Sequence, residues 1–108
     1  MRRGEIWTVA GGPDYSGKPR PMVIIQDDQF SETNSVTLCG LTTSVTEALF
    51  GRPLIRPSAS NGLRSPSRLM VDKIATVPRS KLGYKIGRLD DYDVLQLNIH
   101  LKAFLGLV

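Results

Sequence analysis

The sequence of 108 residues has one cysteine, one histidine and no long apolar run, and each scarcity excludes a class of protein. A single cysteine, Cys39, cannot form an intrachain disulfide, which excludes a disulfide-stabilised scaffold. No apolar stretch approaches the roughly 18 residues that a membrane-spanning helix needs. Two arginines near the start are followed by no apolar segment, so we expect no secretory signal and a cytoplasmic location.

Residues that commonly hold metals are also few. Cys39 and His100 lie far apart in the sequence, and neither forms part of a zinc-type spacing. The neighbouring acids Asp27–Asp28 and Asp90–Asp91 would point to opposite faces of a strand, which makes them poor chelators. We therefore expect no metal and no cofactor. The simplest interpretation of His100 is a helix-surface residue, and that of Cys39 a small buried residue.

Acidic residues are scarce in the middle of the chain. Between Glu47 and Asp90 the only acid is Asp72. The same stretch holds nine cations: Arg52, Arg56, Arg64, Arg68, Lys73, Arg79, Lys81, Lys85 and Arg88. Such a basic segment can attract a polyanion such as a nucleic acid, but a solvated, mildly basic surface explains it equally well.

Short apolar runs separated by Gly, Pro, Asn and Asp predict a mainly β protein. Strands are expected at residues 4–10, 20–26, 35–43, 52–56, 67–77 and 84–89, with a helical turn at 80–82. The run 20–26 is almost continuously apolar, which suits a strand buried on both faces. Pro53 and Pro57 make 52–56 an edge strand.

The period changes near the C-terminus. Apolar residues recur there at steps of three and four, which predicts an amphipathic helix; they are Val94, Leu97, Leu101, Phe104, Leu105 and Val108. Asp90 is the expected N-cap, with Asp91 and Asp93 in the first turn. We predict one domain over residues 1–108, a small SH3-like barrel with a C-terminal helix.

Two features at predicted strand ends are suited to chemistry. Ser16-Gly17-Lys18-Pro19-Arg20-Pro21 brings two cations and a hydroxyl to the start of the second strand, where prolines restrict the backbone beside Arg20. An arginine held in this way suits bidentate contact with a phosphate. Leu41-Thr42-Thr43-Ser44 places three hydroxyls at the end of the third strand. Both features are equally compatible with an ordinary loop cation and ordinary strand threonines.

Several of these motifs, taken in order, resemble the MazF/PemK family of toxins. They are Gly4-Glu5-Ile6-Trp7, Lys18-Pro19-Arg20-Pro21-Met22-Val23-Ile24-Ile25, Thr42-Thr43 and Met70-Val71-Asp72-Lys73-Ile74. The resemblance extends over nearly the whole chain. It implies a CcdB/MazF-type barrel that forms a homodimer and acts as the toxin of a type II toxin–antitoxin pair, with a cognate antitoxin as partner. The loop before Arg20 departs from the family pattern, because it lacks the Glu-Gln found there.

The resemblance also implies an activity. Toxins of this family cleave single-stranded RNA, including mRNA, without a metal and within a short recognition sequence, which inhibits translation and growth. The family's catalytic arginine falls on Arg20, and its catalytic threonine falls on Thr42, or on Thr43 if the alignment shifts by one. Because arginine does not readily lose a proton in proteins, we expect Arg20 to act electrostatically rather than as a base.

Further substrate contacts are expected from the loop and from the basic middle of the chain. Tyr15 is the expected stacking partner of an RNA base, although a half-exposed loop tyrosine is an equally good interpretation. The remaining residues expected to bind substrate are Ser16, Gly17, Lys18, Thr43, Arg64, Arg68 and Lys73.

Two other functions stay open. A CcdB-like inhibitor of DNA gyrase would share the fold, but that activity depends on a tryptophan near the chain end, where this sequence has Phe104-Leu105-Gly106-Leu107-Val108. A basic barrel that binds RNA without cutting it is the other alternative. The Arg20 and Thr42 motifs favour the nuclease.

Overall fold

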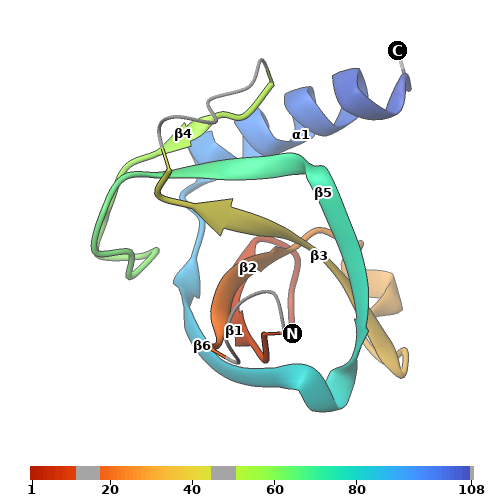
Figure 1. Ribbon diagram of the computed structural model, residues 1–108. Coiled ribbons are helices and arrows are strands. Elements are labelled where there is room, and N and C mark those ends of the chain that lie inside the picture. The colour runs from red at the N-terminus through yellow and green to blue at the C-terminus, as the bar shows by residue number, and fades with distance from the viewer. Residues whose placement is uncertain (12–17, 45–50, 108) are drawn as a thin grey trace.

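The computed structural model describes residues 1–11, 18–44 and 51–107. Within these residues, six strands form one antiparallel sheet in the order β4-β5-β3-β2-β1-β6. The strands are β1 (Glu5–Val9), β2 (Arg20–Ile24), β3 (Ser35–Thr42), β4 (Leu54–Ile55), β5 (Ser67–Pro78) and β6 (Leu82–Arg88). The sheet curls into an incomplete barrel, and the helix α1 (Asp91–Leu105) packs against its outside (Figure 1). The predicted mainly β, SH3-like barrel with a C-terminal helix is confirmed.

The strands lie where the alternation of apolar residues placed them, with shifted ends. The fourth strand is confirmed at the edge of the sheet, but it is limited to Leu54–Ile55 because Pro53 and Pro57 interrupt pairing on either side. The predicted turn at 80–82 is the short 3-10 helix η3 (Arg79–Lys81). A second 3-10 helix, η2 (Asp28–Phe30), was not predicted; its N-cap Asp27 accepts a hydrogen bond from the Gln29 backbone N–H.

β5 bends sharply where it crosses β3. Gly40 of β3 pairs with Met70, whereas its neighbour Cys39 pairs with Ile74, so residues 71–73 are extra on the β5 side. Extra residues in one strand of an antiparallel pair form a bulge, which bends that strand and increases its twist. The bend is visible in Figure 1, where β5 turns from the top of the barrel down its side. It closes the curl of the sheet.

One face of the sheet packs against α1 and forms the larger core. This helix-side core holds fully or almost fully buried apolar residues from the strands and the helix: Ile6, Val23, Cys39, Leu41, Ile55, Leu69, Val71, Leu89, Leu97 and Leu101. At about 25 cal/mol per Å² of buried apolar surface, such a cluster supplies most of the driving force for folding.

The opposite, concave face carries a smaller apolar group, which we call the inner cluster. Val9, Ile24, Val36 and Leu38 are buried in it, and partly buried residues pack around them: Met1, Trp7, Met22, Val77 and Leu82. Adjacent residues of a strand point to opposite faces, so Val23 joins the helix-side core while Ile24 joins the inner cluster.

The prediction that the second strand is buried on both faces is correct only at its end. Val23 and Ile24 are buried, but Pro21 and Met22 are half-buried and Arg20 is exposed. The physical reason is that α1 and the inner cluster cover only the later part of β2. The start of the strand lies open at the end of the barrel.

The C-terminal helix and its predicted N-cap residue Asp90 are confirmed, but one detail of the prediction is wrong. Asp90 occupies the N-cap position without a side-chain capping bond. Phe104 and Leu105, expected on the buried face, are 53% and 49% exposed, because the helix extends past the sheet after Leu101. Gly106 ends the helix with a φ of 70°, a conformation that glycine adopts without strain.

None of the helices in the described part of the chain is both long and apolar enough to cross a membrane.

Candidate functional site

Strand ends from distant parts of the sequence meet at one end of the barrel, which we call the rim. There β1 and β3 end, at Val9 and Thr42, whereas β2, β5 and β6 begin. Val9 pairs with both Arg20 and Leu82, and Thr42 pairs with Arg68. The antiparallel order therefore brings the two chemically interesting strand ends of the sequence, at Arg20 and at Thr42, to one edge.

A cavity of about 750 Å³, the first cavity, opens beside the rim on the concave face. Arg20, Thr42 and Lys73 all line it, so the structure brings together both residues predicted to be catalytic and one predicted substrate cation. Apolar residues form much of the remaining wall, among them Val9, Met22, Met70, Ile74 and Val77. The lining therefore combines cations and hydroxyls with apolar side chains. Such a lining suits a ligand that carries a phosphate next to a less polar group.

Arg20 reaches the first cavity because of its place in β2. It is the first residue of the strand, it pairs with Val9, and it is exposed. Residues two apart in a strand share a face, so Arg20 projects to the same side as Met22, which packs on the inner cluster. Pro19 and Pro21 restrict the backbone on both sides of the arginine.

Thr42 is the last residue of β3, and its hydroxyl is already oriented. The backbone N–H of Ser44 donates a hydrogen bond of 3.1 Å to Thr42 Oγ1. A hydroxyl oxygen that accepts this bond can still donate its own proton to a ligand. Ser44 also lines the first cavity, although sequence reasoning did not assign it a role. Its position in the run Leu41-Thr42-Thr43-Ser44 is the sequence feature that could have identified it.

Lys73 lies in the β5 bulge, next to a partly buried ion pair. Arg52 Nε and Nη2 donate to Asp72 Oδ1 and Oδ2, each at 2.8 Å, and the Arg52 side chain is 2% exposed. The hydrogen bonds from Arg52 hold the pKa of Asp72 below its ordinary value, against the opposing effect of burial. This pair ties Arg52, two residues before β4, to the bulge and so helps to fix the backbone that carries Lys73.

Thr43 and Arg64 face a different cavity. This second cavity, of about 560 Å³, is lined by Pro21, Thr43, Gly62, Leu63, Arg64, Ser65, Ser67, Tyr84, Lys85 and Ile86. Thr42, the last residue of β3, lines the first cavity, whereas Thr43, the first residue after the strand, lines the second. Pro21 lines both cavities.

The other predicted substrate residues are dispersed. Arg68 lies opposite Thr42, and its Nη1 donates to the carbonyl oxygen of Arg52 at 2.9 Å. Lys18 is exposed and lines neither of the two cavities. Tyr15, Ser16 and Gly17 lie outside the described residues.

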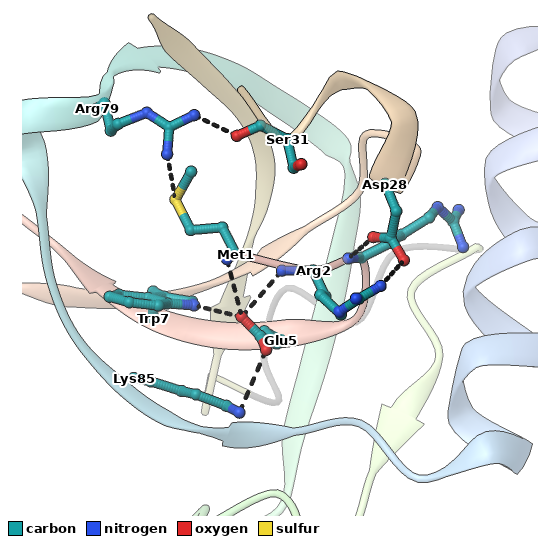
Figure 2. A network of polar contacts seen from close by, with 9 residues as sticks. Met1, Arg2, Glu5, Trp7, Asp28, Ser31, Arg79 and Lys85 are labelled. Carbon is teal, nitrogen blue, oxygen red and sulfur yellow. Dashed lines mark hydrogen bonds and ion pairs between the residues drawn. The ribbon is translucent and has the colours of Figure 1, made fainter. Parts of the chain in front are cut away.

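A polar network joins the start of the chain to the sheet and includes Met1 and Trp7, which pack on the inner cluster (Figure 2). Glu5 Oε1 accepts hydrogen bonds of 3.0 Å from the Arg2 backbone N–H and from the Trp7 indole, and Oε2 lies 3.2 Å from Lys85 Nζ. Burial alone raises the pKa of Glu5, but these donors together outweigh it and the pKa falls below its ordinary value. Arg79 donates to the Ser31 carbonyl and to Met1 Sδ, 3.7 Å away. The network fixes the first residues of the chain to the barrel.

Neither Cys39 nor His100 lines the first cavity. Cys39 is fully buried in the helix-side core, and burial raises the pKa of its thiol to about 12. A thiol with this pKa is a poor nucleophile at neutral pH. His100 lies on α1, where its Nδ1 is 2.8 Å from the Gln96 carbonyl oxygen. The structure therefore agrees with the sequence interpretation of these two residues as structural.

Comparison with protein families gives a match over nearly the whole chain. Residues 2–105 match the model of the PemK-like, MazF-like toxin of type II toxin–antitoxin systems. The chain is 49% identical over 107 residues to a probable endoribonuclease MazF from Mycolicibacterium smegmatis, and the alignment covers 99% of this chain and 98% of the relative.

Solved structures show the same fold. A mycobacterial endoribonuclease in complex with its cognate antitoxin superposes with a TM-score of 0.83 at 20% identity, covering 100% of this chain and 97% of the other. The Mycobacterium tuberculosis toxin MazF-mt6 superposes with a TM-score of 0.79 at 26% identity, covering 94% and 96% of the two chains.

Proposed function

Because the chain belongs to the PemK-like, MazF-like toxins of type II toxin–antitoxin systems, we propose that it is an endoribonuclease that cuts single-stranded RNA in the first cavity. The observation that carries this proposal is the convergence of Arg20 and Thr42 on one cavity from separate strands. A phosphodiester bound there would meet a guanidinium and a hydroxyl donor together.

RNA carries its own nucleophile, and this decides what the protein must supply. The 2′-hydroxyl gives its proton to solvent water as its oxygen attacks the adjacent phosphorus, the bond from phosphorus to the 5′-oxygen breaks, and the leaving oxygen takes up a proton from solvent. The products are a 2′,3′-cyclic phosphate, or the 3′-phosphate to which it hydrolyses, and a 5′-OH. The protein has to align the two oxygens in line and stabilise the charge that develops on the phosphoryl oxygens.

Arg20 and Thr42 divide the stabilisation between them. Arg20 contacts the phosphoryl oxygens and the leaving 5′-oxygen through a guanidinium that stays charged throughout, so its role is electrostatic. Thr42 donates its hydroxyl proton to a non-bridging oxygen while its own oxygen accepts the Ser44 N–H. Lys73, which also lines the cavity, adds a second positive charge. None of these steps requires a metal.

The family also indicates partners for this chain. A related mycobacterial endoribonuclease was solved with its cognate antitoxin, and the Deinococcus radiodurans MazF was solved with MazE. We propose that this chain likewise forms a homodimer and is held inactive by an acidic antitoxin segment. Such a segment would compete with RNA for the cations of the rim, because carboxylates and phosphates are bound by the same guanidinium geometry.

The test is cleavage of a long RNA in the presence of a chelator, with the ends of every product identified. We expect cuts within a short common sequence, a cyclic or 3′-phosphate on one side and a 5′-OH on the other. Arg20→Ala should remain folded and lose cleavage by a factor on the order of 10²–10³, which is the usual effect of removing one preorganised donor. A fully active Arg20→Ala protein, or RNA that stays intact with the unaltered protein, would overturn the proposal.

A further inference from the structure

The second cavity has the features of a binding site that the cleavage reaction itself does not need. It adjoins the first cavity through Pro21, which lines both, and through the neighbours Thr42 and Thr43. An RNA strand with a phosphate at Arg20 therefore continues past the rim towards this second space. The residues on its walls decide what part of the strand fits there.

Tyr84 presents an aromatic ring to the second cavity. Its side chain is 68% exposed, and its hydroxyl has no hydrogen-bond partner in the part of the chain that the structure describes. The backbone beneath the ring is nevertheless fixed, because the Tyr84 N–H donates to Thr8 Oγ1 at 2.9 Å. Gly83 permits this approach, since a Cβ there would lie 2.2 Å from the same oxygen. An exposed ring on a fixed strand is a stacking platform for a base.

Arg64 supplies the charge. It is exposed, and it makes no ion pair with any residue in the described ranges. Lys85 also lines the cavity, but its Nζ lies 3.2 Å from Glu5 Oε2, so its charge is already compensated. Arg64 is therefore the residue that can contact a phosphate in this space.

The loop before β5, which carries Arg64, is held in place by hydrogen bonds. Asn61 is fully buried, and its side chain accepts from the backbone N–H groups of Ser58 and Leu63 and donates to the Arg56 carbonyl. The Arg88 N–H donates to the Ser60 carbonyl at 2.9 Å, which ties this loop to β6. A site whose walls are already held in place loses less conformational freedom when a ligand binds.

We propose that the second cavity is a subsite for one RNA nucleotide flanking the scissile phosphate. Tyr84 stacks on the base of that nucleotide, and Arg64 contacts its phosphate. This inference rests on the proposed endoribonuclease function. It makes Tyr84 a specificity-determining residue of this chain, because stacking strength and the room around the ring differ between bases.

The experiment uses a short RNA containing one mapped cleavage site and a series of copies, each with a single abasic ribonucleotide at one flanking position. Tyr84→Ala should raise KM about tenfold on the intact RNA, with kcat nearly unchanged. On one abasic copy the variant and the unaltered protein should have equal KM, because the stacked base is already missing. Tyr84→Phe keeps the ring and should match the unaltered protein, and thermal melts of both variants report folding.

The Arg64→Gln variant tests the proposed phosphate contact independently of the stacking at Tyr84. The dependence of log(kcat/KM) on log salt concentration should become shallower by about 0.7, the value for one phosphate contact on a single strand. A Tyr84→Ala protein that cleaves every RNA like the unaltered protein, or is weakened equally on every abasic copy, would overturn the subsite. The subsite would also be overturned if Tyr84→Ala or Arg64→Gln weakened binding to an antitoxin and left RNA cleavage unchanged. An unaltered protein that cuts no RNA would instead overturn the proposed function.

Discussion

The two faces of the curled sheet differ in how they are packed, although the same strands contribute residues to both. The helix-side core is sealed by α1 and consists of apolar residues such as Leu69 and Leu97 that are fully buried. The concave face has the smaller inner cluster, and two of its members, Met22 and Val77, also line the first cavity. The concave face is left open at the rim, where Met22 and Val77 contribute to the lining of the first cavity.

Because successive residues of a strand point to opposite faces, one residue can stabilise the core while its neighbour lines the cavity. Val23 lies in the helix-side core, whereas its neighbour Met22 packs on the inner cluster and lines the first cavity. Val23 is buried, whereas Arg20, three residues earlier in the same strand, is exposed. Each face can therefore be perturbed without changing the other, and the predictions below test that separation.

The largest effect is expected on the closed face. Leu97→Ala removes a fully buried side chain from the contact between α1 and the sheet, and it should lower the free energy of unfolding by about 2–5 kcal/mol. Leu95→Ala is the matched control, since the same substitution on the same helix affects a side chain that is 59% exposed. Its effect should stay within about 0.5 kcal/mol. Urea unfolding measures both, and equal losses would contradict the assignment of the core.

The next effect is expected on the open face and separates two adjacent threonines. Thr42→Val removes a hydroxyl from the first cavity and should reduce RNA cleavage by a factor on the order of 10² or more, with little change in melting temperature. Thr42→Ser keeps the hydroxyl and should retain most activity. Thr43→Val alters the second cavity instead and should have a much smaller effect on kcat. If Thr43→Val were the more damaging substitution, the catalytic role would belong to Thr43.

Alternation in the sequence predicted the strands of the fold. The family resemblance, carried by the Arg-Pro and Thr-Thr motifs, predicted catalytic roles for Arg20 and Thr42, and the structure places both residues in the lining of the first cavity. The choice between Thr42 and Thr43 depends on which of the two residues lines the first cavity. That depends on how β5 pairs with the end of β3, and this pairing is not contained in the local sequence.

The second cavity shows what local patterns do not contain. Arg64 and Tyr84 are twenty residues apart, and they line one space because the loop before β5 is tied to β6 by the Arg88–Ser60 hydrogen bond. No motif in either segment signals that contact. The helix is a second example. Its apolar period predicts that Phe104 is buried, but the period carries no information on where the sheet ends, and Phe104 is exposed.

A smaller effect is expected where the two faces are joined, at the Arg52–Asp72 ion pair. Asp72→Asn leaves the buried guanidinium of Arg52 without a countercharge and should destabilise the fold by about 2 kcal/mol, less than a fully buried pair because Asp72 is 26% exposed. The double variant Arg52→Met with Asp72→Leu removes both charges and should recover much of this loss. Chemical unfolding of the three proteins provides the comparison. A double variant as unstable as the single variant would show that the charges do not act as a pair.

The smallest effect is expected at acid pH, at the Glu5 network of Figure 2. The folded pKa of Glu5 lies below its ordinary value of 4.5, so its carboxylate stabilises the fold above that pH. This contribution is lost as the pH falls through the lower, folded value. Glu5→Gln should cost about 1 kcal/mol at neutral pH and make stability less dependent on pH in the acid range.

Lys85→Met sharpens the same measurement, because it keeps the carboxylate and removes one of its donors. The folded pKa of Glu5 should then rise, so the loss of stability on acidification should be smaller and complete at a higher pH than in the unaltered protein. Thermal melts between neutral pH and the acid transition measure both variants. If Lys85→Met left the acid transition unchanged, the Lys85 ammonium would have no part in holding Glu5 ionised, and the network would depend on the Arg2 and Trp7 donors alone.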